Sequence, residues 1–372
     1  MESNRIWEDF PMRRRNFDTA VRFAVLTFVF GVMAALPGYA PAAPQTVEEI
    51  VNYMGADRQA VLEAGAKKEG EALFYQVGTQ SEPAIKRFRE KYPYIDLKSY
   101  RSDNAQLVRR VVEEYKANRY VADLYGANTG GLVALREAGL LQPFDSPELA
   151  HYRKDGIEAH RNWAVYYMSY LSLGYNTKIA PEAASINTYD DLLDPKWKGK
   201  MYVSDWTSSS ANWVGVLVLE RGEDYVRRFA KQEIVAYAMS PRAVANLIVS
   251  GEAPISPITY SSHIANSRSE GASVAWKALG TTFSNPGGIG ILTKSPHPHA
   301  TMLFVDFSLS LEGQKMNEDL GYSSARLDMP EGMTPKSAVD LSQRPNFLTE
   351  YEQWNRLASQ VFGKGKESAS QK

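Results

Sequence analysis

The amino-acid sequence predicts an α/β fold divided between two domains. Short apolar runs alternate with helical segments of about 10–15 residues, an alternation typical of βαβ units around a largely parallel sheet. The chain has 372 residues, and about 150 residues per domain predicts two domains. With 44% apolar and 23% charged residues, the composition is that of an ordinary globular protein.

The charge balance and the absence of cysteine exclude several function classes. Lys and Arg number 42 against 43 Asp and Glu, a formal net charge of −1, which excludes a strongly basic nucleic-acid binder and a highly charged disordered chain. The chain has no Cys, which excludes thiol catalysis, Cys-ligated zinc, iron–sulfur clusters and disulfides. For the same reason we expect no lipid anchor on an N-terminal Cys.

The first 42 residues have the pattern of a secretory signal peptide. Three consecutive arginines, Arg13 to Arg15, precede an apolar run from Phe23 to Leu36. That run is shorter than the roughly 20 residues needed to span a bilayer. The small residues Ala40-Pro41-Ala42 then form an A-x-A cleavage site. We therefore expect residues 1–42 to be removed and the mature protein to be soluble outside the cytoplasm.

Two details of this segment stay open. Arg14-Arg15-Asn16-Phe17 fits part of a twin-arginine signal, so both export of the folded chain and general secretion are compatible with the sequence. Met12 is an alternative start, because residues 1–11 add nothing that a signal peptide needs.

Three strand–helix units are expected in the first half of the mature chain. Apolar positions at helical spacing over 46–69 come first, and Gly55 and Gly65 interrupt that segment, which favours two shorter helices over one. The strands are expected at 72–75, 95–100 and 122–125, and the helices at 83–92, 104–117 and up to Glu137.

Two loops that follow these strands are the first candidate ligand contacts. Residues 78–81 and 126–131 are rich in Gly, Thr, Ser and Asn, and ligands of such sheets bind at the carboxyl ends of strands. Ordinary turn chemistry explains the same composition. The candidate contacts are Thr79, Gln80, Asn128 and Thr129.

The second half contains a candidate anion site. Strands are expected over 166–175 and 201–204, and the second leads into four hydroxyl residues, 207–210, before a helix over 211–219. Free N–H groups at a helix start attract anions, although a simple N-cap needs only one of these hydroxyls. Arg242 follows Ser240-Pro241 at another predicted helix start and either binds an anion or points into solvent. Candidate contacts are Thr207, Ser208 and Arg242, with Trp206, Tyr166 and Tyr167 as walls.

Catalytic motifs are absent from the sequence. It contains no G-x-S-x-G, H-E-x-x-H or G-x-x-x-x-G-K-[ST]. Residues 285–290 lack the spacing of a dinucleotide-binding loop and are predicted to form a turn. The rigid Pro298 between His297 and His299 disfavours a shared metal, and His263 is interpreted as a packing or surface residue. We expect no enzyme; a secreted hydrolase is the alternative.

One segment closely resembles a known family. Residues 191–200, DLLDPKWKGK, match the extracellular solute-binding proteins of ABC transporters, in the branch that binds iron(III), thiamine and phosphonates. Weaker marks of the same family stand in order from about residue 70 to residue 327. They are 122–124 with 137–141, 173–177, 250–252, 270–274, and 297–300 with 311–314.

The resemblance implies a two-lobed, type II periplasmic-binding fold, with mixed sheets flanked by helices and a ligand cleft between the lobes. Lobe 1 would comprise 43–165 plus 285–345, lobe 2 would comprise 166–284, and 346–372 would form a C-terminal helix and flexible tail. The lobes would close around the ligand by a hinge motion. The resemblance further implies a monomer without a cofactor, whose partners are a small solute and the membrane permease of an ABC importer.

The ligand pattern departs from the iron-binding members. Thr79 and Gln80 stand in the loop where those members have a His, Asn128 stands where they have a Glu, and Tyr260-Ser261 replaces their Tyr-Tyr pair. We therefore expect no resident metal and a small anionic organic solute, such as a phosphonate, phosphate ester or carboxylate. Ferric iron held by Tyr260 and exogenous anions is the alternative. The expected ligand contacts are Thr79, Gln80, Asn128, Thr129, Tyr166, Trp206, Thr207, Ser208, Arg242, Tyr260 and Ser261.

Overall fold

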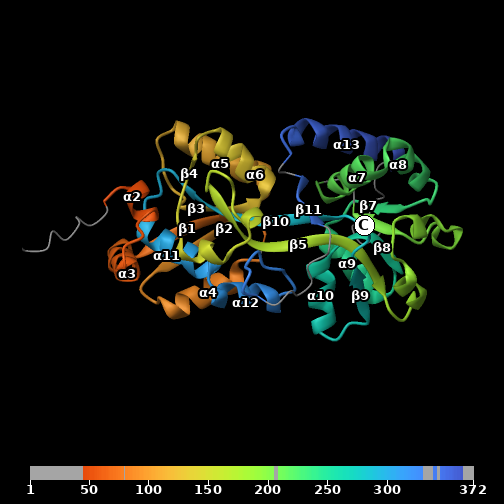
Figure 1. Ribbon diagram of the computed structural model, residues 1–372, viewed down its shortest axis with the longest axis horizontal. Coiled ribbons are helices and arrows are strands. Elements are labelled where there is room, and N and C mark those ends of the chain that lie inside the picture. The colour runs from red at the N-terminus through yellow and green to blue at the C-terminus, as the bar shows by residue number, and fades with distance from the viewer. Residues whose placement is uncertain (1–44, 79, 205–207, 330–337, 342–343, 363–372) are drawn as a thin grey trace, which may run out of the picture. The chain divides into compact units, whose positions relative to one another are not determined.

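A computed structural model describes residues 45–78, 80–204, 208–329, 338–341 and 344–362 (Figure 1). The predicted signal peptide lies outside the described residues, as do Thr79, Trp206 and Thr207. Within the described ranges, no helix is both long and apolar enough to cross a membrane.

A mixed sheet of nine strands runs through the described chain in the order β2-β1-β3-β10-β5-β8, with β4, β9 and β11 paired at its sides. β1 pairs in parallel with β2 and β3, whereas β10 and β5 pair antiparallel with each other and with their other neighbours on this path. This arrangement confirms the predicted α/β class with a mixed sheet. The largely parallel sheet expected from the strand–helix alternation is wrong, because β5 and β10 pair antiparallel with their neighbours on this path. The strands are β1 (Glu71–Gln76), β2 (Asp96–Arg101), β3 (Leu124–Asn128), β4 (Leu141–Gln142), β5 (Trp163–Asn176), β8 (Ile255–Tyr260), β9 (Val274–Lys277), β10 (Thr282–Leu292) and β11 (Ala338–Val339). A separate parallel pair is formed by β6 (Tyr202–Ser204) and β7 (Val235–Tyr237).

The helices flank these strands, and local capping explains several of their starts. Asp103 accepts from the N–H of Gln106 at the start of α5, and Ser240 accepts from the N–H of Ala243 at the start of α9. The break predicted at Gly55 separates α2 from α3, but the interruption predicted at Gly65 is wrong, because α3 continues through this residue, which lies against the ring of His299. The helices are α2 (Val47–Val51), α3 (Arg58–Glu69), α4 (Glu82–Lys91), α5 (Asn104–Lys116), α6 (Thr129–Glu137), α7 (Ser208–Arg221), α8 (Glu223–Ala230), α9 (Pro241–Ser250), α10 (Ser261–Ser269), α11 (Pro298–Leu309), α12 (Leu311–Asp319) and α13 (Phe347–Phe362).

Two large hydrophobic cores share the strands β5 and β10. The first core takes β5 up to Tyr170 and β10 from Ile289, whereas the second core takes β5 from Leu171 and β10 at Phe283. Both strands therefore cross from one core to the other. The predicted lobe boundaries stay a prediction.

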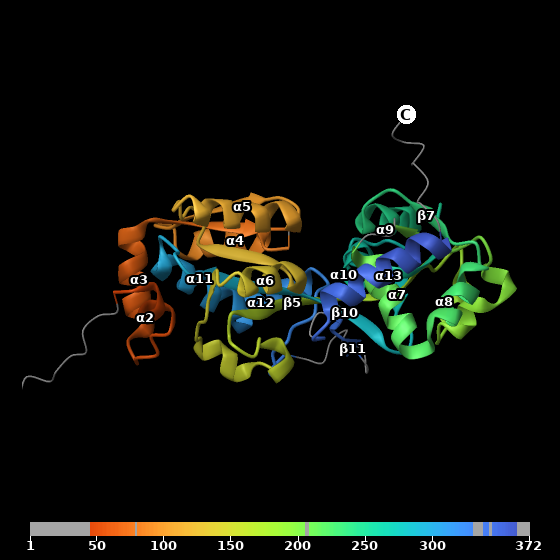
Figure 2. The ribbon, with the colours of Figure 1, turned by 90° about the horizontal axis from the view of Figure 1, so that it is seen from above.

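The C-terminal helix α13 belongs to the second core. It lies against α7 in both views (Figures 1 and 2). Trp354 of α13 packs over Gly215 of α7, where any larger side chain would collide with the indole. This contact holds α13 against the middle of α7.

The turn predicted over 285–290 is wrong, because these residues lie inside β10. Pro286 has no N–H to donate, and it stands opposite Met168 of β5. The backbone N–H and C=O of Met168 both bond to Ser323 instead, so no ladder bond is missing at the proline. The register shifts between Gly287 and Gly288.

The loop predicted over 126–131 is also wrong. β3 extends to Asn128, because residues 126–128 pair with residues 287–289 of β10, and α6 follows at once from Thr129. Pairing with a strand distant in sequence thus turns a Gly-rich segment into strand.

His297 and His299 stand at the start of α11, where each imidazole lies against a carboxylate. His297 Nδ1 lies 3.0 Å from Asp123 Oδ2, and His299 Nδ1 lies 2.6 Å from Glu69 Oε1. Their side chains are only 23% and 18% exposed, because α11 is buried along most of its length.

Candidate functional site

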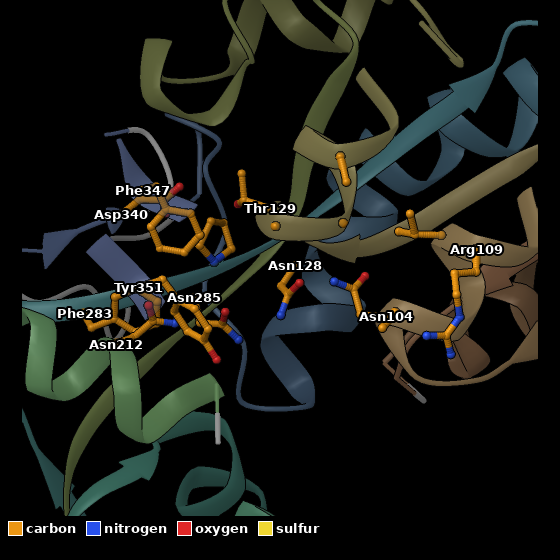
Figure 3. Close-up of a pocket in the computed structure, with 16 residues that line it drawn as sticks. Asn104, Arg109, Asn128, Thr129, Asn212, Phe283, Asn285, Asp340, Phe347 and Tyr351 are labelled. Atoms are coloured by element: carbon orange, nitrogen blue, oxygen red, sulfur yellow. The ribbon is translucent and has the colours of Figure 1, made fainter. Parts of the chain in front are cut away.

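A pocket of about 560 Å³ lies where the starts of α5 and α6 face β10, α7 and α13 (Figure 3). α7 and α13 belong to the second core, whereas the buried residues of α5 and α6 form a separate hydrophobic cluster. Its lining residues are Asn104, Ala105, Val108, Arg109, Asn128, Thr129, Gly130, Gly131, Ala134, Asn212, Phe283, Asn285, Pro286, Asp340, Phe347 and Tyr351.

The polar side chains of this pocket include four amides, beside the charged residues Arg109 and Asp340. Asn104 begins α5, Asn128 ends β3, Asn212 lies in α7 and Asn285 lies in β10. The Oδ1 atoms of Asn128 and Asn212 are buried and have no hydrogen-bond partner in the described protein. Asn104 Oδ1 accepts from the hydroxyl of Tyr125 at 2.6 Å, which leaves its NH₂ group for a ligand. Amides both donate and accept, so this wall can hold neutral polar groups.

Aromatic side chains form the facing part of the pocket. Phe283 comes from β10, and Phe347 and Tyr351 come from successive turns of α13. Figure 3 shows these rings grouped across from Asn128 and Asn104. Flat apolar surfaces beside amides suit an organic molecule with both a carbon skeleton and polar groups.

A second group of residues continues from the pocket through Asn285. Asn285 Nδ2 donates to the hydroxyl of Tyr260 at 3.4 Å, and the ring centre of Tyr260 lies 5.3 Å from that of His263. Arg242 Nη1 donates to the backbone carbonyl of His263 at 3.1 Å. On the first core, Gln80 Nε2 donates to the hydroxyl of Tyr167 at 3.3 Å.

The electrostatics of this group leave Arg242 as its net charge. Burial, together with the charge of the nearby Arg242, lowers the pKa of His263 to about 4, so the imidazole is neutral at neutral pH. Burial also raises the pKa of the Tyr167 phenol, so it too stays neutral. Arg242 is half-buried and has no carboxylate within ion-pair distance among the described residues. Such a guanidinium needs an anion to compensate its partial desolvation.

Two predicted contacts serve the protein interior instead. Tyr166 was expected to wall the cleft, but both faces of β5 are covered there, and its hydroxyl lies 2.8 Å from Ser81 Oγ inside the first core. Ser261 Oγ accepts from the backbone N–H of Tyr170 at 3.1 Å and joins the start of α10 to β5.

The other predicted contacts divide into three sets. Asn128 and Thr129 line the pocket. Gln80, Arg242 and Tyr260 belong to the neighbouring group. Ser208 begins α7, and its side chain is outside the described part of the structure, as are Thr79, Trp206 and Thr207.

Sequence reasoning missed Asn104, Asn212, Asn285 and the α13 aromatics. Asn104 could have been found, because it follows the carboxyl end of β2 just as Asn128 ends β3. No local signal points to Asn212, Phe347 or Tyr351. Over the described ranges, no group of three or more His, Asp or Glu side chains is placed to hold a metal ion.

Comparison with known proteins connects this chain to bacterial binding proteins. The family model for the bacterial extracellular solute-binding proteins matches residues 83–343. Iron uptake protein A1 of Synechocystis is 24% identical over 227 residues, which is 56% of this chain and 62% of that protein. Iron uptake protein A2 of the same organism is 22% identical over 230 residues, 56% of this chain and 66% of that protein. The chain thus matches under two thirds of the length of both relatives.

Solved structures share the fold at low identity. The Trichodesmium FutA protein in complex with iron and citrate superposes with a TM-score of 0.64 at 18% identity, over 79% of this chain and 100% of that one. AfuA from Actinobacillus pleuropneumoniae, with fructose-6-phosphate bound, superposes with a TM-score of 0.62 at 22% identity, over 79% and 99%. These likenesses confirm the two-lobed type II periplasmic-binding fold. Because the family match covers most of the chain, this protein belongs to the bacterial extracellular solute-binding proteins.

Proposed function

We propose that this protein captures a small organic anion in the periplasm and delivers it to the membrane permease of an ABC importer. Residues 43–165 with 285–345 and residues 166–284 act as the two lobes, and they close on the ligand. Residues 1–42 direct export, and the mature protein works as a monomer without catalysis. Family membership supports this role.

Arg242 is the observation that carries the anion assignment. The other described arginines without a carboxylate partner, such as Arg268, are exposed. Arg242 is instead half-buried near the neutral imidazole of His263 and the phenol of Tyr322, whose pKa burial raises. A charge-assisted hydrogen bond to a ligand carboxylate or phosphoryl group satisfies its remaining N–H donors.

The pocket, which Asn285 links to the group containing Arg242, favours an organic ligand over a bare ion. Its volume of about 560 Å³ falls in the range of roughly 300–1,000 Å³ typical of small-molecule sites. Phe283, Phe347 and Tyr351 offer apolar surface that an inorganic anion does not use.

Ferric iron is the second candidate, because two relatives are named iron uptake proteins and the FutA neighbour holds iron and citrate. Tyr260 is the phenol that matches the family's iron-binding position. Its hydroxyl receives a hydrogen bond from Asn285, and the Glu position of that pattern is the neutral Asn128. Hard Fe³⁺ prefers anionic oxygen ligands, so this site needs exogenous anions to complete its coordination.

Thermal-shift measurements on the purified protein test both candidates. Phosphonates, phosphate esters, carboxylates and ferric citrate are added separately, and a ligand at 100 times its Kd stabilises by about 2.7 kcal/mol. We expect Arg242→Met to weaken binding of the stabilising anion by about 30-fold or more, because it removes one partner of a charge-assisted contact. The exposed Arg268→Met is the control and should leave affinity unchanged. Equal affinity in Arg242→Met contradicts the proposal, and stabilisation by ferric salts alone favours the second candidate.

A further inference from the structure

The pocket amides identify a chemical class of ligand more narrowly than its charge does. Asn128 and Asn212 come from opposite sides of the pocket, one from the start of α6 and one from α7. Their Oδ1 atoms are buried and unpartnered in the described protein, and Asn212 is only 8% exposed overall. A buried carbonyl without a partner is costly, so the bound ligand is expected to supply donors here.

Neither amide is needed for the local fold. Asn128 occupies the N-cap position of α6, yet its side chain makes no capping hydrogen bond. Asn212 lies in the second turn of α7, where no capping group is required. Polar side chains that are desolvated without making a hydrogen bond in the fold are candidates for ligand recognition.

The chemistry of an amide selects the ligand group. A neutral amide cannot balance a second anionic group on the ligand, besides the one held by Arg242. It offers a hydrogen-bond donor and an acceptor side by side. A hydroxyl group also donates and accepts, so it satisfies an amide in either orientation. Asn104, whose NH₂ group is unused beside its bond to Tyr125, extends the same surface.

The aromatic residues opposite these amides require a carbon skeleton. Phe347 and Tyr351 of α13 line the pocket, and the C–H faces of a hydroxylated carbon chain or ring pack against aromatic rings. From these features we infer that the ligand is an organic anion whose carbon skeleton carries hydroxyl groups, as in a sugar acid or a sugar phosphate. This inference rests on the proposed function, because Arg242 holds the anionic end.

Isothermal titration with matched probes tests the inference. Gluconate is compared with hexanoate, and glycerol 3-phosphate with propyl phosphate, so that each pair differs in its hydroxyl groups. Sorbitol tests the hydroxylated carbon skeleton without a charge, and inorganic phosphate tests the negative charge without a carbon skeleton. We expect the hydroxylated anion to bind at least about tenfold more tightly than its partner in at least one pair, and both single-feature probes to bind more weakly than it does.

Asn212→Leu and Asn128→Leu should reduce that ratio to below about threefold while the affinity for the hydroxyl-free anion is kept. Asn355→Leu is the matched control, because Asn355 Oδ1 in α13 is likewise buried and unpartnered but does not line the pocket. Having two amide variants keeps the test decisive if one of them fails to fold, which circular dichroism reports.

Each outcome bears on a separate claim. A wild-type ratio near one in both pairs, or a ratio unchanged in the folded amide variants, overturns the hydroxyl assignment and leaves anion capture standing. Sorbitol binding as tightly as gluconate overturns anion capture and leaves the hydroxyl assignment standing. Failure of all six probes to bind overturns the inference.

Discussion

Removing the carboxylate of Asp123 should strongly destabilise the first core. Asp123 is fully buried at the beginning of β3. Its Oδ2 accepts from the backbone N–H of Leu73 at 2.8 Å, and its Oδ1 accepts from the backbone N–H of His297 at 2.8 Å and from Ser295 Oγ at 2.6 Å. One side chain therefore joins β1, β3 and the start of α11.

The cost of Asp123→Ala follows from the donors left behind. The Ser295 hydroxyl can turn to Thr301 Oγ1, 3.3 Å away, but the two backbone N–H groups lose their acceptor. At about 1–3 kcal/mol for each buried unpaired group, the loss should be about 4 kcal/mol, a large share of the roughly 5–15 kcal/mol of a typical domain.

Urea unfolding followed by far-UV circular dichroism measures this loss, with separate transitions fitted if the two cores unfold independently. Asp155→Ala is the control. Asp155 is 72% exposed in its ion pair with Arg153, so we expect a change below about 0.5 kcal/mol. A loss below about 1 kcal/mol in Asp123→Ala would refute the reasoning, because it would mean that the orphaned N–H groups find other partners.

Two further predictions concern stability. The hydrogen bond to Asp123 raises the pKa of His297, so the protonated histidine's contribution to the free energy of unfolding is complete below its unfolded pKa of about 6.5 and is lost as pH rises through the folded value. The difference in urea midpoint between wild type and His297→Gln should therefore shrink from pH 5.5 to pH 9. A constant difference contradicts this. Gly287→Ala should destabilise by about 1–3 kcal/mol, because its Cβ meets the ring of the buried Tyr167, whereas Gly130→Ala should stabilise by about 0.5–1 kcal/mol, since in α6 its Cβ only approaches Asn128 Oδ1 at 3.9 Å; equal thermal midpoints for the two variants contradict this.

Local sequence signals were sufficient where a site residue stands at the junction of a strand and a helix. Asn128 and Thr129 were predicted because a Gly-rich segment follows a buried strand, and the structure places both in the pocket wall. Arg242 was predicted as a ligand contact because Ser240 and Pro241 indicate a helix start, and α9 begins at Pro241. These signals depend on neighbours within a few residues, so they survive without knowledge of the fold.

Long-range contacts decided the rest of the site. The predicted turn at 285–290 became strand because β3 and β5 supply partners on both sides of β10, and this pairing brings Asn285 to the pocket. Phe347 and Tyr351 reach it because Trp354 seats α13 on α7. Tyr166 lies in the first core and not at the predicted cleft wall, because both faces of β5 are covered at its position.

The sequence by itself determined the α/β class, the family and most of the regular elements, because hydrophobic periodicity, helix caps and family motifs each depend on residues close together in the chain. Only the tertiary structure decided which polar groups are left without partners. Whether Asn212 is satisfied, or whether Arg242 meets a carboxylate, depends on residues distant in sequence that burial brings near or keeps away. The ligand chemistry that we propose rests on those unmet hydrogen bonds and on the charge of Arg242, and both are properties of the packed molecule.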